Sequence, residues 1–139
     1  MKNKNKAVWG TRFNNTTSKI FEKIGASIDI DKRLFEEDIF ASIVHVQMLV
    51  KQKIIDRKIG KKIINGLKKI KVEIKKNKFN FNKKYEDIHL NIEKRLFEII
   101  GGDAGYLHIA RSRNDQVTTD FKLWIKKASK EININLNNL

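Results

Sequence analysis

Apolar side chains that recur every three or four residues are the feature that most constrains the fold of this chain. Four stretches show this spacing, which places their apolar residues on one face of an α-helix. No stretch shows the alternating pattern typical of a β-strand. The sequence therefore predicts an all-α fold. The expected apolar faces are Phe35, Ile39, Ile43, Val46 and Val50; then Ile59, Ile63, Leu67, Ile70 and Ile74; then Ile88, Ile92, Leu96 and Ile99; and finally Val117, Phe121, Trp124 and Ala128.

Residues that cap or stop helices set the expected boundaries. Asp29 or Asp31 can cap the first helix, Asp56 the second, and Asn114 or Asp115 the fourth. The third begins near Glu86 and ends at Gly101-Gly102, a pair that can supply the positive φ angles of a helix stop. Gly60 and Gly66 weaken the second helix. The fourth should run from near Asn114 at least to Glu131, and residues 75–84 should form a loop.

Composition restricts the class of protein further. The chain has no cysteine, hence no disulfide framework, and it has no apolar run as long as a membrane span or signal peptide, which predicts a soluble cytoplasmic protein. Its net charge is +14, from 30 Lys and Arg against 16 Asp and Glu. Such a charge allows a basic nucleic-acid-binding module, but the lysines do not alternate with aromatic residues that could stack on bases. We therefore expect no specific nucleic-acid partner.

The segment RSRNDQ, Arg111 to Gln116, holds the densest group of directional polar side chains, and it directly precedes a predicted helix. A guanidinium group matches a carboxylate with two parallel hydrogen bonds, and a helix start adds free backbone N–H donors. This combination predicts an anion-binding site. The alternative interpretation is a polar loop with ordinary helix caps and surface ion pairs.

Several motifs together resemble the argininosuccinate lyases of the fumarase and aspartase superfamily. They are WGTRF at Trp9 to Phe13, SIDIDKRLFEEDIFASIVH at Ser27 to His45, EDIH at Glu86 to His89, a glycine-rich turn that ends at His108, and RSRNDQ. The resemblance runs from Trp9 to about Trp124. It implies a helical N-terminal lyase domain over residues 1–112 and, over residues 113–139, the truncated start of a long helix of the central bundle, in a subunit that forms a homotetramer.

The resemblance also assigns roles to individual residues. It implies that Ser27, Ser112, Arg113 and Asn114 contact the substrate, argininosuccinate, and that Asp87, His89 and Arg111 support them. The reaction would be a β-elimination that releases arginine and fumarate without a cofactor. The base and its partner histidine belong to family segments beyond residue 139, so this fragment alone should be inactive.

Alternatives follow from the residues themselves. Helix caps or satisfied buried polar groups could explain each site residue, and this interpretation is favoured for Asp38 and His45. His89 and Glu93 are four apart, which indicates an ion pair within one helix in preference to a metal site. The chain departs from the family pattern at Thr11, Ile109 and Ala110, so a relic without catalytic activity is a second possible function.

Overall fold

The computed structural model describes residue 20 and residues 24–139. The predictions for Trp9, Thr11 and Phe13 lie outside these residues. Within the described residues every regular element is helical, which confirms the all-α prediction. In chain order the elements are α2 (Ile28–Asp31), η2 (Lys32–Leu34), α3 (Phe35–Lys51), α4 (Arg57–Lys75), η3 (Lys83–Tyr85), α5 (Ile88–Ile100), η4 (Gly101–His108) and α6 (Arg113–Asn137), where η denotes a 3-10 helix.

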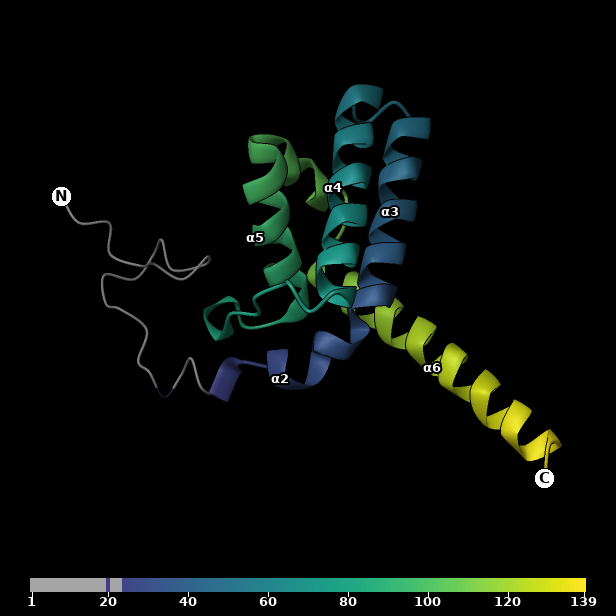
Figure 1. Cartoon of the computed structure of the whole chain (residues 1–139). Coiled ribbons are helices and arrows are strands. Elements are labelled where there is room, and N and C mark those ends of the chain that lie inside the picture. The colour runs from purple at the N-terminus through teal and green to yellow at the C-terminus, as the bar shows by residue number, and fades with distance from the viewer. Residues whose placement is uncertain (1–19, 21–23) are drawn as a thin grey trace.

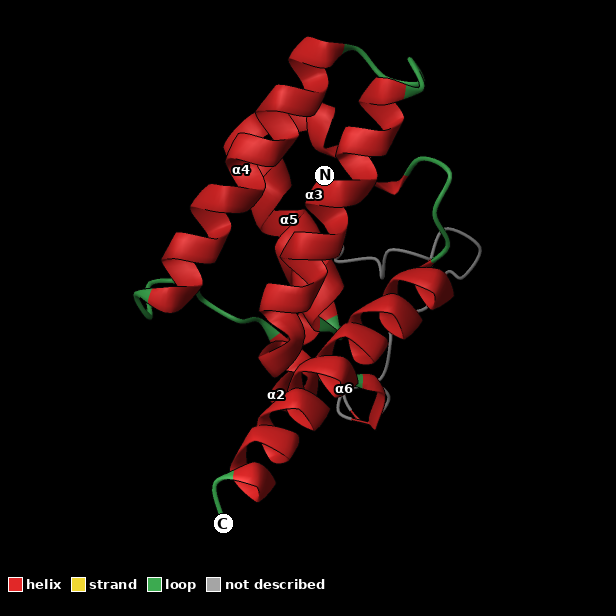
Figure 2. Ribbon diagram, turned by 90° about the vertical axis from the view of Figure 1, so that its right-hand side faces the viewer, coloured by secondary structure: helices red, strands yellow, loops and turns green. Residues whose placement is uncertain are grey.

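Three helices form a bundle from which the last helix departs. Helices α3 and α4 are antiparallel neighbours (Figure 1), and α5 packs against α4 and also contacts α3. Helix α6 contacts α3 near the base of the bundle and then extends away from it, as both views show (Figures 1 and 2). The start of α6 therefore lies where α3 and α5 meet, while its second half projects from the bundle.

The predicted apolar faces of the first three helices form the core. Among the described residues fourteen hydrophobic residues are buried. Eight of them belong to the predicted faces of α3, α4 and α5 and have no more than 1% of their surface exposed: Ile39, Val46, Ile63, Leu67, Ile70, Ile88, Ile92 and Leu96. The glycines of α4 permit close helix contacts. A Cβ on Gly66 would lie 2.5 Å from Leu96 Cδ1, and a Cβ on Gly60 would overlap the Val50 side chain.

The apolar face predicted for α6 forms at the expected spacing but is only partly covered by the described residues. Val117 and Phe121 are 39% and 51% exposed, and the side chains that α6 buries are Gln116 and Asp120. Helix α6 extends to Asn137, which confirms the predicted minimum length. Trp124 and Ala128, the other two residues of the predicted face, are partly buried.

Two predicted helix boundaries were confirmed, and the cap predicted for the first helix was wrong. The Asp56 carboxylate accepts the Lys58 backbone N–H, and Gly101 ends α5 with φ of 71°. Helix α3 follows Leu34, with no side-chain cap, because Ile28–Asp31 form a separate short helix. Asp31 instead accepts a hydrogen bond from the Ile88 backbone N–H at the start of α5, at 3.2 Å.

Residues 75–84 are largely a loop, as predicted, with η3 beginning at Lys83. No helix among residues 24–139 combines the length and the apolar composition that crossing a bilayer requires.

Candidate functional site

The start of α6 is organised by Ser112, not by the predicted caps Asn114 or Asp115. The Ser112 hydroxyl accepts a hydrogen bond from the Asp115 backbone N–H at 3.1 Å and donates one to Asp115 Oδ2 at 2.8 Å. This reciprocal arrangement satisfies one of the free donors of the first turn. Asn114, also in that turn, is exposed, and its side chain has no hydrogen bond to another described residue. Asn114 is therefore free to contact a ligand.

Arg113 joins α6 to α5. Its Nη1 donates to Gln116 Oε1 at 2.7 Å, and its Nη2 lies 3.0 Å from Glu93 Oε1. Its Nε lies 3.9 Å from Asp87 Oδ2, which is a weaker ion pair. Because a guanidinium has five N–H groups, these contacts leave donors available for an additional anion. The Arg113 side chain is 30% exposed.

Ser27 and Asp87 lie in the same neighbourhood. The Ser27 backbone N–H donates to the Glu86 carbonyl at 2.9 Å, and its hydroxyl donates to Asp31 Oδ2 at 2.6 Å. Asp87 caps α5 through a 2.6 Å hydrogen bond from the Leu90 backbone N–H. The structure thus connects Ser27 with the start of α5, and the start of α5 with Arg113. Direct substrate contacts of these residues stay a prediction.

Behind the start of α6 lies a buried polar cluster made of Asp38 from α3, His89 from α5, and Gln116 and Asp120 from α6. Each member is at most 2% exposed. His89 Nδ1 lies 3.1 Å from Asp38 Oδ1 and 3.5 Å from Asp120 Oδ2, and Gln116 Nε2 donates to Asp38 Oδ1 at 2.5 Å. The cluster therefore fixes three helices relative to one another.

The charges of this cluster follow from burial and from neighbouring groups. Burial, reinforced by the Asp38 charge, raises the pKa of Asp120 to about 8. Burial opposes the charged forms of Asp38 and His89, but their mutual attraction outweighs it, so the pKa of Asp38 is lowered and that of His89 is raised. The fold therefore favours the charged forms of Asp38 and His89 and, up to about pH 8, the protonated form of Asp120.

The ligand-type atoms of Asp38, His89 and Asp120 all lie within 4.8 Å of one another. His89 Nδ1 and Asp38 Oδ1 are 3.1 Å apart, an ion-pair distance, but Nδ1 and both Asp120 oxygens have no hydrogen-bond partner among the described residues. The Arg111 guanidinium also interacts with both carboxyl groups, which adds positive charge to the same region. The three groups therefore form a buried ion pair, His89 with Asp38, beside the Asp120 carboxyl group.

Arg111 supports the cluster from the loop that precedes α6. Its Nη1 donates to Ser42 Oγ on α3 at 3.0 Å, and burial lowers its pKa. Nearby, His45 Nε2 donates to the Ile109 carbonyl at 2.9 Å, which confirms the prediction of a satisfied polar group. Asp38 fits that prediction only in part, because its Oδ2 is buried without a hydrogen-bond partner among the described residues.

Two features of the site differ from the sequence predictions or were missed. The expected ion pair between His89 and Glu93 does not form, because Glu93 pairs with Arg113 and with His108 Nδ1, at 3.0 and 3.5 Å. Gln116 and Asp120 were not predicted as buried. Their spacing of four residues, on a face of α6 adjacent to that of Val117 and Phe121, is the signal that could have identified them.

Ala110, where the sequence departs from the family pattern, has an unfavourable backbone conformation. Its φ is 55°, a conformation that L-residues other than Asn and Asp rarely adopt and that glycine adopts freely. Ile109, the other departure within the described residues, packs against the hydrophobic core through its partly buried side chain.

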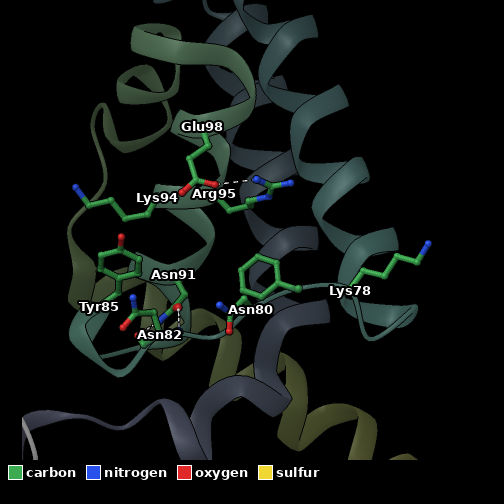
Figure 3. Close-up of a pocket in the computed structure, with 9 residues that line it drawn as sticks. Lys78, Asn80, Asn82, Tyr85, Asn91, Lys94, Arg95 and Glu98 are labelled. Atoms are coloured by element: carbon green, nitrogen blue, oxygen red, sulfur yellow. Dashed lines mark hydrogen bonds and ion pairs between the residues drawn. The ribbon is translucent and has the colours of Figure 1, made fainter.

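A separate polar pocket lies between the loop after α4 and helix α5 (Figure 3). Its polar groups are largely paired with one another. Arg95 pairs with Glu73 at 2.8 and 2.9 Å and with Glu98 at 2.7 Å, and the buried Asn91 amide holds the Asn82 backbone through both its oxygen and its nitrogen. These pairings anchor the loop and indicate a structural role.

Comparisons with known proteins agree with the motifs. A model of the family described as Lyase matches residues 11–139. Along its whole length the chain is 65% identical to an argininosuccinate lyase of Pelagibacter ubique, of which it covers 30%. It is 49% identical to an argininosuccinate lyase of Ehrlichia ruminantium (strain Welgevonden), over 95% of the chain and 29% of that relative. It is 54% identical to an argininosuccinate lyase of Ehrlichia chaffeensis, over 87% of the chain and 26% of that relative. The chain spans about 30% or less of the length of these curated relatives.

Proposed function

Because the chain belongs to the lyase family, we propose that it is the substrate-binding part of an argininosuccinate lyase, which cleaves argininosuccinate to arginine and fumarate in arginine biosynthesis. The observation that carries this proposal is the 65% identity to the Pelagibacter relative, which extends along the whole chain and includes the RSRNDQ segment. The arrangement of donors at the start of α6 is consistent with it.

The proposed reaction explains why donors gather at this helix start. Removal of a proton next to a carboxylate produces an intermediate with additional negative charge before the guanidino nitrogen leaves. Preorganised donors stabilise such an intermediate more than the ground state. Asn114, whose amide is free, and Arg113, which retains unused N–H groups, would supply these donors together with Ser27 and Ser112.

The supporting residues would hold this arrangement in place. Asp87 caps α5 and faces Arg113, while His89 and Arg111 connect the start of α6 to helices α3 and α5. The proton-abstracting base and its partner histidine would come from other parts of the enzyme. No cofactor takes part in this scheme.

The same proposal assigns residues 1–112 to an N-terminal helical domain and residues 113–139 to the start of a central bundle helix. In a cytoplasmic homotetramer, other helices of that bundle would cover Val117, Phe121 and Ile125, which are 39%, 51% and 42% exposed in this chain. The spacing of these three residues fits a helix that packs along one side against such neighbours.

A chimeric enzyme tests the proposed function. In it, this chain replaces the matching region of the Pelagibacter lyase, and fumarate release from argininosuccinate is followed by ultraviolet absorbance. We expect turnover by the chimera and none by the 139-residue chain alone. A chimera that folds and assembles but forms no fumarate would contradict the proposal, and fumarate formation by the chain alone would place the base within it.

A further inference from the structure

Gln116 connects the most buried part of the polar cluster to the exposed start of α6. Its side chain is 2% exposed. The Nε2 group donates to Asp38 Oδ1 at 2.5 Å, and the Oε1 atom accepts from Arg113 Nη1 at 2.7 Å. A carboxylate can only accept and a guanidinium can only donate, so a single orientation of the amide satisfies both partners.

The Asp38 end of this connection is fixed. Asp38 is 1% exposed on α3, and His89 Nδ1 lies 3.1 Å from the oxygen that Gln116 contacts. An Asp38 anion attracts the amide hydrogens, which makes the contact a charge-assisted hydrogen bond. Gln116 therefore has little freedom to rotate.

The Arg113 end is held at two points. Gln116 binds Nη1, and Glu93 on α5 lies 3.0 Å from Nη2. A guanidinium fixed at two nitrogens presents its unused N–H groups in a constant direction. Fixing a flexible side chain before the ligand arrives reduces the entropy lost on binding.

We propose that Gln116 is a positioning residue, which transmits the fixed location of the buried Asp38 carboxylate to the Arg113 guanidinium and so orients Arg113 toward the substrate. The substrate part of this inference rests on the proposed lyase function. The positioning part rests only on contacts within this chain.

Nuclear magnetic resonance of the guanidinium groups tests the positioning part in the 139-residue chain. We expect Arg113 to show slow rotation and distinct Nη protons, whereas the exposed Arg57 should rotate freely. Equal mobility of Arg113 and Arg57 in the unmodified chain would overturn the proposal without any variant.

Substitutions then isolate Gln116. Gln116→Met has a similar volume but neither polar end, so Arg113 should become mobile. Gln116→Glu retains an acceptor for Arg113 but has no N–H to donate to Asp38, so Arg113 should also become more mobile. Gln47→Met, at an exposed position on α3, is the matched control. Unchanged Arg113 signals in a folded Gln116→Met chain would overturn the proposal.

Kinetics of the chimera test the link to substrate. Gln116→Met should raise KM for argininosuccinate about tenfold, the effect of one weakened hydrogen bond, with a smaller change in kcat. Gln116→Glu, which loses the hydrogen bond to Asp38, should raise KM by a similar factor. Unchanged KM and kcat in an active Gln116→Met chimera would also overturn the proposal. An unmodified chimera without activity would contradict the proposed function, whereas the resonance measurements would still decide the role of Gln116.

Discussion

Asp120 is the residue whose protonation state the fold changes most clearly. It is fully buried on α6 and faces Asp38 of α3, His89 of α5 and the preceding Arg111. Burial and the Asp38 charge raise the pKa of Asp120 to about 8, while His89 and Arg111 oppose this increase. The carboxyl group is therefore neutral at physiological pH, which lowers the cost of burying it beside Asp38.

This protonation makes stability depend on pH. Between about pH 4 and pH 8 the folded chain holds a proton on Asp120 that the unfolded chain has released, so the free energy of unfolding should fall as pH rises and level off above pH 8. For one proton the free energy of unfolding changes by about 1.4 kcal/mol per pH unit. The raised pKa of His89 acts in the same direction.

Asp120→Asn removes this titrating group, so the free energy of unfolding of the variant should lack the fall that Asp120 causes. The free energy of unfolding of the variant minus that of the unmodified chain should therefore increase as pH rises from 5 to 8. Denaturant unfolding followed by circular dichroism measures the difference. Asp56→Asn is the control, because Asn caps a helix about as well as Asp at this exposed position. Parallel profiles for the unmodified chain and Asp120→Asn would show that Asp120 titrates normally.

At the scale of elements, sequence patterns predicted the helices better than their ends. The helical spacing of apolar residues identified the buried faces of α3, α4 and α5, since those faces depend on local periodicity. The caps of α3 and α6 were wrong for different reasons. Asp31 bonds to Ile88, a partner distant in sequence, and Ser112 precedes the adjacent candidates Asn114 and Asp115, which local chemistry cannot rank.

Backbone conformation around η4 yields a prediction about stability. Gly101 has φ of 71° and ψ of −148°, a region essentially restricted to glycine, so Gly101→Ala should lower the free energy of unfolding by about 1–3 kcal/mol. Ala110, with φ of 55°, should behave oppositely, and Ala110→Gly should raise that energy by up to about 1 kcal/mol.

Gly102→Ala is the control for both substitutions. Gly102 lacks a positive φ, and nothing lies within 4 Å of an added Cβ, so this change should be neutral or slightly stabilising. Thermal and denaturant unfolding would measure all three variants. Similar losses from Gly101→Ala and Gly102→Ala would contradict the distinction between the two glycines.

At the scale of the whole molecule, α6 combines a polar buried side with an exposed apolar side. The sequence revealed the apolar periodicity of Val117, Phe121 and Trp124, but periodicity cannot say which chain covers such a face. The buried cluster was equally hard to predict, because Asp38, His89 and Asp120 meet only after three helices pack. Motifs identified the candidate site, whereas its supporting contacts required the structure.

The most direct test of the proposed role of the α6 start is the activity of the chimera after Asn114→Ala. Asn114 is exposed, and Ser112 provides the cap, so the substitution should leave the fold intact. We expect kcat/KM to fall by about 10²–10³, the usual effect of removing a preorganised donor to developing negative charge. Asn65→Ala, at an exposed position on α4, should have almost no effect. If a folded, fully assembled Asn114→Ala chimera kept the unmodified rate, the start of α6 would not be the substrate-binding site.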